Sequence, residues 1–405
     1  MSGTGRCPAA SLRRSSSFSE SAPMLWLLDR LSDAAGQRPV PDNDGYLTGY
    51  PLPNGTYALA RTWYAHDAPR PNSVWTHTLL LPHGALDGTD VSRLVSALHA
   101  PGSANDLESY AQPFDVTELL HGHPEPLTDV ALVADAVTSL YFVGETPAWV
   151  ELPDVRRRNT LALALWSQQW PRLRRRFTFC TGAIELRRLD QRPVDLLLRP
   201  PGYTGIVHAS AGGSASYGID AWRVLVDDLG HPGLLREFLR RCGSDTSRLE
   251  SAALFAGVWA SAVRTDEPLR VTFDRVVAAA PLPTQLRRLK RSLLRGKQAI
   301  LLCRDAFEVV EGLTQPRIGQ ALYAEDVGLE DWLGRLWDDD PRALGTALRQ
   351  ATAAETDGRE SPATVTESMV RFARSIVLRR ARPADLPWVA VDAPNVAADL
   401  LSTHA

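Results

Sequence analysis

The chain has few of the features that mark well-known classes of protein. Its four cysteines, Cys7, Cys180, Cys242 and Cys303, stand alone in the sequence. Because no two of them have metal-ligand or CxxC spacing, we expect no metal site and no disulfide framework, and we expect a cytoplasmic protein. No apolar run reaches the roughly 20 residues that a membrane-spanning helix needs, so we expect no membrane partner.

Motifs for nucleotide binding and serine hydrolysis are also missing. The Gly/Ser-rich stretch over residues 202–218 contains no Gly-Lys-Ser/Thr, and no GxGxxG opens a predicted helix. No GxSxG occurs either. We therefore interpret this stretch as a linker, and we expect neither a cofactor nor catalytic residues that the sequence alone can name.

Lysine is almost absent, since only Lys290 and Lys297 stand among the 44 basic residues and the rest are arginine. The chain has 405 residues, of which 44% are hydrophobic and 22% are charged, so it can bury the cores of two or more domains. Its net charge of -3 gives no overall case for nucleic acid as a partner.

Hydrophobic patterns predict an α+β N-terminal half. Apolar residues at spacings of three and four predict helices, and β-branched and aromatic runs predict strands. The predicted helices cover residues 24–35, 90–99, 127–142 and 156–170. The predicted strands cover residues 57–63, 74–81, 149–152, 174–186 and 195–199.

The second half carries helical periodicity alone. The predicted helices cover residues 219–229, 233–242, 246–263, 284–295, 298–312, 341–353 and 361–380. We therefore predict an α+β fold with a mixed sheet-and-helix half over residues 24–215 and an all-helical domain over residues 216–405. The Ser/Arg-rich residues 1–23 are expected to be disordered or a misannotated start.

One block near the N-terminus, residues 44–81, combines turns, aromatic residues and one histidine. It contains Tyr57-Ala-Leu-Ala-Arg-Thr-Trp63 and Val74-Trp-Thr-His-Thr-Leu-Leu-Leu81. Strand alternation places Trp75, His77 and Leu79 on one face. His77 is then either a base or ligand, or a half-buried residue whose ring bonds a neighbouring backbone group or carboxylate. No Ser, Cys or acid lies at a spacing that would commit it to catalysis.

Arginines in the same block allow a second interpretation. Arg61 lies in the first predicted strand, and Arg70 lies on a loop stiffened by Pro69 and Pro71. Either the loop presents an arginine finger to a nucleotide-hydrolysing partner, or these residues form ordinary surface contacts. The candidate partner-binding residues of this block are Arg61, Trp63, Arg70, Trp75 and His77.

Three basic runs occur later, at residues 156–158, 172–176 and 287–297. In the third, leucines at helical spacing form one stripe and cations fill the rest of the surface. Arg287, Arg288 and Arg291 are our candidates there. They form either a docking surface for an acidic protein or nucleic acid, or a solvated helix face paired with nearby acids.

The block resembles the N-terminal domain of a bacterial family called GTPase-associated protein one. The residues that carry the likeness are Gly45-Tyr-Leu-Thr-Gly-Tyr-Pro-Leu-Pro, Tyr57-Ala-Leu-Ala-Arg-Thr-Trp63, Arg70-Pro and Val74-Trp-Thr-His-Thr-Leu-Leu. A second string, Trp170-Pro-Arg-Leu-Arg-Arg-Arg-Phe-Thr-Phe-Cys-Thr-Gly182, is similar to the segment that opens the family's middle region. Residues 1–21 lack the family's opening strand.

The resemblance implies a role beside a GTPase in bacterial conflict, or defence, systems. There the protein would be a non-enzymatic adaptor or regulator between the GTPase and an effector. The resemblance assigns no catalytic residue. A catalytic regulator that uses an arginine finger or His77, and a nucleic-acid-binding sensor, stay open as alternatives.

Overall fold

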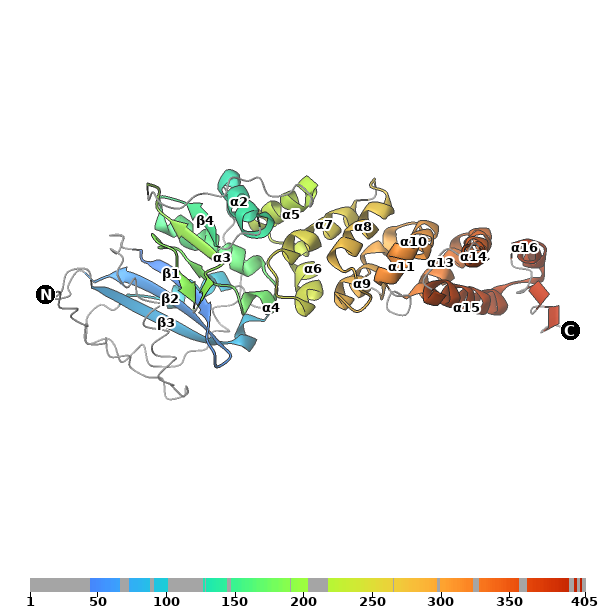
Figure 1. The fold of residues 1–405 in the computed structure, drawn as a ribbon, viewed down its shortest axis with the longest axis horizontal. Helices are drawn as coiled ribbons and strands as arrows, with labels where there is room; N and C mark the ends of the chain where they lie inside the picture. The colour runs from blue at the N-terminus through green and yellow to red at the C-terminus, as the bar shows by residue number, and fades with distance from the viewer. Residues whose placement is uncertain are drawn as a thin grey trace. The chain divides into compact units, whose positions relative to one another are not determined.

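The protein is described here from a computed structural model, which divides into two compact units. Unit 1 is Met1–Gly213 with Leu229–Pro232, and unit 2 is Ser214–Asp228 with Gly233–Ala405 (Figure 1). The structure describes residues 44–65, 73–87, 91–100, 127, 129–143, 147–189, 191–202, 218–264, 266–296, 299–322, 328–356, 363–392, 397–398 and 401–402. The predicted helix over residues 24–35, the segment 1–23 and the predicted boundary near residue 215 lie outside these residues.

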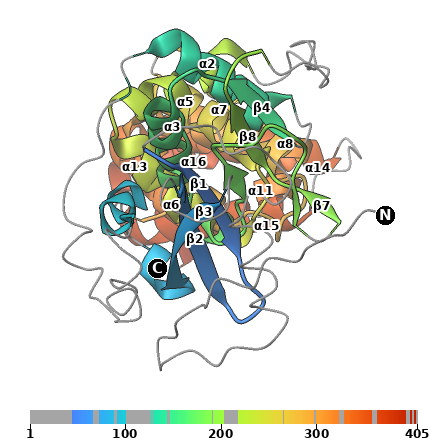
Figure 2. The same cartoon turned by 90° about the vertical axis from the view of Figure 1, so that its left-hand side faces the viewer.

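Unit 1 is built on a six-stranded mixed sheet with the strand order β3-β2-β1-β5-β8-β4 (Figure 2). The first four strands in that order are antiparallel neighbours, whereas β8 runs parallel to β5 and β4. The strands are β1 (Tyr46–Pro51), β2 (Thr56–Tyr64), β3 (Val74–Pro82), β4 (Ala148–Glu151), β5 (Phe179–Cys180) and β8 (Leu196–Arg199). A separate ribbon pairs β6 (Arg188–Leu189) with β7 (Arg192–Pro193).

The strands predicted over residues 57–63 and 74–81 are confirmed as β2 and β3, each slightly longer than expected. Strand β1 was not predicted, because Gly45, Gly49 and Pro51 are poor strand formers. Gly49 is needed there, since a Cβ at this position would lie 2.6 Å from the hydroxyl oxygen of Tyr57. The turn into β2 uses Gly55 at φ +79°, a conformation that glycine adopts without strain.

Helical elements of unit 1 pack against its sheet. The central one is α3, whose side chains are buried from Leu161 to Gln168. Its Trp166 stacks on Tyr57 of β2 with ring centroids 4.7 Å apart. The helical elements are η1 (His83–Leu86), η2 (Val91–Ala97), α2 (Val130–Val137), the π-helical η5 (Thr138–Phe142), α3 (Val155–Gln168) and α4 (Pro171–Arg174).

A chain of buried hydrogen bonds ties α3 to the sheet. The amide of Leu47 in β1 donates to Oγ1 of Thr181 at 2.7 Å. The Thr181 hydroxyl donates to Oδ1 of Asn159 at 2.5 Å, and the Asn159 amide group donates to the carbonyl of Gly45 at 2.9 Å. Because every link is buried, each group depends on its neighbour in the chain for its hydrogen bond.

The regular elements that the structure describes in unit 2 are all helices, as predicted. Its longer helices are α5 (Gly218–Gly230, of which residues 229 and 230 belong to unit 1), α6 (Leu234–Cys242), α7 (Ser251–Val263), α8 (Leu269–Ala279), α9 (Arg287–Leu294), α10 (Ala306–Thr314), α13 (Leu329–Asp339), α14 (Pro341–Thr356) and α15 (Ala363–Arg380). Short segments are η7 (Gly243–Asp245), η8 (Ile300–Cys303), α11 (Pro316–Leu322), η9 (Pro383–Asp385) and α16 (Leu386–Asp392).

Each helix of unit 2 packs mainly on helices that are close to it in the sequence. Helix α7 has small and apolar residues on nearly every side and packs against α6 and α8. Further along the chain, α10 packs against α13, and α13 against α14 and α15. Buried polar contacts accompany this packing, such as Arg236 Nε donating to Asp228 Oδ2 at 2.8 Å.

Several predicted elements were wrong in detail. Residues 174–186 were predicted as one strand, but only Phe179–Cys180 pairs in the sheet, because a helical turn precedes it and a Gly-containing turn follows. The helix predicted over residues 298–312 is two elements, η8 and α10, since the side chain of Asp305 caps a new helix by accepting the amide of Glu308. Residues 90–99 contain the 3-10 helix η2.

Candidate functional site

The pairing of β2 and β3 brings together four of the candidate partner-binding residues. Arg61 lies opposite His77, and Trp63 lies opposite Trp75. Residues two apart on a strand share a face, so these four side chains form one cross-strand block. The fifth candidate, Arg70, lies outside the described residues.

Arg61 is used by the fold. Its Nε and Nη2 donate to the carbonyl oxygen of Asp44 at 2.8 and 2.5 Å, and its Nη1 donates to the carbonyl oxygen of Leu98 at 3.3 Å. The guanidinium carbon also lies 5.1 Å from the ring centroid of Trp63. Arg61 therefore joins the start of β1 and the end of η2 to the sheet, and a role in phosphate chemistry would require these bonds to break.

His77 also contacts the end of η2. Its Nδ1 accepts a hydrogen bond from the amide of His99 at 3.4 Å, and the two imidazole rings meet edge to face at 5.2 Å. Burial, followed by repulsion from His99, lowers the pKa of His77 to about 4. His77 is therefore neutral near pH 7, and this geometry matches the half-buried residue bonded to a backbone group that the sequence left open.

The block lies on the face of the sheet that is shared with Tyr57, Leu59 and Gly49, according to the strand register. Tyr57 on that face stacks on α3, and η2 packs against α3. We conclude that the candidate residues of the block face the helices of unit 1. Sequence reasoning could not find Asp44, Leu98 and His99 as their partners, since two of the three act through a carbonyl that every residue has.

The first two basic runs mostly serve unit 1 as well. Arg174 is buried and donates to the carbonyl oxygen of Leu86 at 3.1 Å and to that of Ser167. Arg156 pairs with Asp44 at 2.5 Å, and this hydrogen bond lowers the pKa of the aspartate. These contacts show that Arg156 and Arg174 take part in the fold of unit 1.

The third basic run lies in unit 2. Arg287, Arg288 and Arg291 lie on α9 of unit 2, and all three are exposed. Lys290 of the same helix is fully buried, and its Nζ donates to the carbonyl oxygens of Leu282, at 2.9 Å, and of Pro283. The sequence pattern placed the leucine stripe correctly but gave no sign that one of the cations is internal.

Within the described ranges, no three His, Cys, Asp or Glu side chains gather in a way that could hold a metal ion. The helices in the same ranges include none that is long and apolar enough to cross a bilayer.

These observations define a two-unit protein in which a unit with a mixed sheet and helices precedes an all-helical unit. Comparison with known families confirms the resemblance to the GTPase-associated family, because residues 10–98 match the model of GTPase-associated protein 1, N-terminal domain type 1. The match takes in positions 10–21, where the sequence showed us no likeness. The likeness of residues 170–182 to the family's middle region stays a prediction.

We find no match to the chain among curated proteins or solved structures.

Proposed function

We propose that this protein is a non-enzymatic adaptor or regulator that works with a GTPase in a bacterial conflict system and acts in the cytoplasm. The observation that carries the proposal is the match of residues 10–98 to a domain whose family name refers to association with a GTPase. The partner proteins are the GTPase and an effector of the same system.

The geometry of the cross-strand block supports an adaptor more than a catalyst. Arg61 donates to two backbone carbonyls, and His77 accepts from a backbone amide. A general base at neutral pH needs a pKa near the working pH, whereas burial lowers that of His77 to about 4. An arginine finger needs a guanidinium that can reach phosphate oxygens. Because Arg61 is bonded to backbone carbonyls, Arg70 is the better candidate for this alternative.

The test begins with the tagged full-length chain in its native host. Proteins that co-purify are identified by mass spectrometry, and a recovered GTPase is then mixed with the purified chain and sized by chromatography. A stable complex near equal stoichiometry supports the proposal. Failure of any GTPase to co-purify, or of the purified pair to form a complex, contradicts it.

The hydrolysis rate of the complex separates the adaptor from the arginine finger. We compare Arg70→Ala with Arg188→Ala, a matched loss of an exposed arginine in unit 1. A finger would lose about 10³-fold in stimulated hydrolysis with Arg70→Ala alone. An adaptor would show the same hydrolysis rate and the same complex for both variants.

A further inference from the structure

Helix α9 presents a dense row of arginines on the outer face of unit 2. Arg287, Arg288, Arg291 and Arg295 are exposed, all within or directly after this short helix. We infer that this arginine face, defined by these four residues, is the docking surface for an acidic segment of a partner protein. The inference rests on the proposed function for the biological identity of that partner.

The arginine face exists because α9 buries its leucines on one side and exposes its arginines on the other. Leu289, Leu293 and Leu294 are fully buried and hold α9 in unit 2. On the other side, Arg287 and Arg291 are four residues apart, so they lie on one edge of the helix about 6 Å from each other. Arg295 follows directly after the helix in an extended conformation. The arginine face can therefore pair with a few carboxylates of a short acidic segment.

The start of α9 is held firmly. Leu286, directly before the helix, has φ +45°, a left-handed conformation that is costly for a bulky side chain and persists only where the surroundings impose it. The buried Nζ of Lys290 donates to the carbonyl oxygen of Leu282, and Asp245 Oδ2 accepts the amide of Arg288 at 3.5 Å. The first two arginines are therefore presented from a fixed backbone, which lowers the entropy lost on binding.

The surroundings favour a protein over a nucleic acid as the occupant. The side chain of Leu282 is 54% exposed, and its carbonyl contact with Lys290 places it at the start of α9. Arginine beside exposed apolar surface is typical of protein interfaces.

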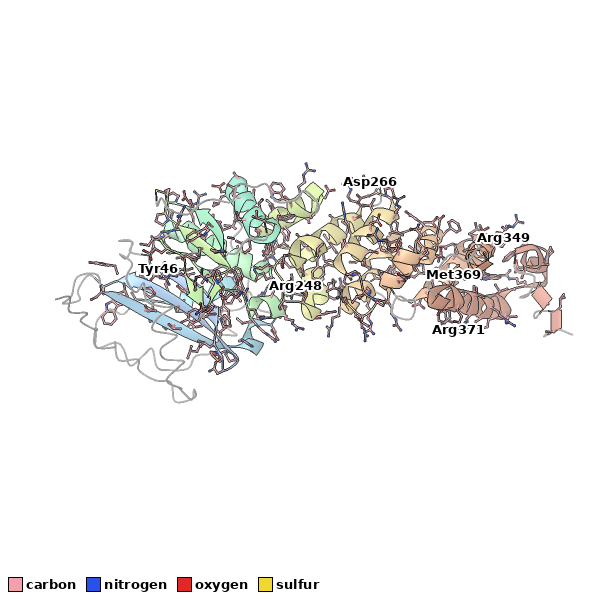
Figure 3. All side chains as sticks on the ribbon, viewed as in Figure 1. Tyr46, Arg248, Asp266, Arg349, Met369 and Arg371 are labelled. Carbon is pink, nitrogen blue, oxygen red and sulfur yellow. The ribbon has the colours of Figure 1, made fainter. Side chains whose placement is uncertain are left out.

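Helix α6 extends the surface. It packs against α9, and its Arg240 is exposed. Both helices lie on the lower side of unit 2 in Figure 1, and Arg371 of α15 projects from the same side in Figure 3. Exposed Glu237 interrupts the positive charge on α6. The arginine face is thus a local feature of one short helix, of a size suited to a short acidic segment.

The test uses the full chain and a fluorescein-labelled poly-glutamate peptide, with a Gly/Ser peptide of equal length for comparison. Binding is followed by fluorescence anisotropy at about 50 mM salt and again at about 200 mM, where exposed charges are more strongly screened. Arg287→Glu with Arg291→Glu reverses two charges of the face. Arg342→Glu with Arg349→Glu is the matched control, because both residues are exposed on α14 and the net charge changes equally.

We expect the wild-type chain and the α14 control to bind poly-glutamate alike, and the α9 variant to bind at least about tenfold more weakly. An equal loss of affinity in both variants would mean that only net charge matters, and it would overturn the inference. Absence of binding by the wild-type chain would also overturn it. We also measure binding of a single-stranded DNA of similar charge. If it binds more tightly than poly-glutamate and is weakened by the same α9 variant, the occupant is a nucleic acid and the inference of a protein partner is overturned.

The milder pair Arg287→Gln with Arg291→Gln repeats the comparison if charge reversal lowers the melting temperature. Because the probe contains no GTPase, failure of peptide binding leaves the GTPase complex untouched. Conversely, a chain that binds the peptide but no GTPase contradicts the proposed function alone.

Discussion

The hydroxyl of Thr181 is the link on which the junction of α3, β1 and β5 depends. Its Oγ1 accepts the amide of Leu47 at 2.7 Å and donates to Oδ1 of Asn159 at 2.5 Å. Thr181→Val keeps the shape of the side chain and removes both bonds. The amide of Leu47 then has no acceptor from this side chain, and Asn159 loses a donor, in a site where water does not reach either group.

Each buried polar group that loses its partner costs about 1–3 kcal/mol. Two such groups give an expected loss of about 2–4 kcal/mol in the free energy of unfolding of unit 1. The amide of Leu47 reports this loss directly, because its hydrogen exchange is limited by opening of the junction. At about 1.4 kcal/mol per factor of ten, the exchange rate should rise about 30-fold or more.

Hydrogen exchange of the β1 peptide, resolved by mass spectrometry, is the assay. The control is Thr48→Val, a change of the same residue type in the same strand as Leu47. The Thr48 hydroxyl only reaches the sulfur of Cys180 at 3.7 Å, so we expect a change of less than about 1 kcal/mol. Thr181→Ser keeps the hydroxyl and should restore most of the protection. Equal exchange in Thr181→Val and Thr48→Val would refute the reasoning.

Two further predictions concern unit 1. Since the pKa of His77 is lowered to about 4 while the unfolded chain protonates near its ordinary value, stability should fall as pH drops from about 6.5 to about 4, by on the order of 1–2 kcal/mol after allowance for solvent screening. Urea midpoints at about pH 7 and pH 5 should therefore differ less in His77→Gln than in the wild type. Gly182→Ala places a Cβ 2.8 Å from the Cβ of Tyr46 and should cost about 1–3 kcal/mol, whereas Gly84→Ala meets nothing within 4 Å and should be neutral in thermal melts.

The elements that could be predicted from the sequence are those whose residue pattern is typical of one kind of secondary structure. Strands β2 and β3 have runs of β-branched and aromatic residues, and α9 has leucines at helical spacing. The helices that we missed lack such clarity. Helix α8 contains Val271, Thr272, Val276 and Val277, which favour strands as readily, and α11 and α13 are interrupted by Gly319 and Gly334. Tertiary packing decides these segments.

The partners of the candidate residues could not be predicted, because the sequence does not tell which backbone groups meet. Arg61 binds a carbonyl 37 residues away in the sequence, and Leu47 reaches a hydroxyl 134 residues away. A charged residue in a strand can face solvent or the fold, and only the strand register chooses between them. Lys290 could not be recognised as buried for the same reason, because the sequence around it is the same as that around the exposed arginines of α9.

Arg61 and the arginine face of α9 therefore predict opposite behaviour for the same kind of residue. Arg61→Met removes the hydrogen bonds that Arg61 donates to the carbonyls of Asp44 and Leu98 and should lower the free energy of unfolding by about 2 kcal/mol. Partner binding should then fall only as far as the folded population falls. Arg287→Glu with Arg291→Glu should do the reverse, with a smaller change in melting temperature and weaker binding to an acidic partner. Thermal melts and binding curves on the same preparations measure both, and an Arg61→Met protein that stays fully stable but no longer binds a GTPase would place the cross-strand block in the interface after all.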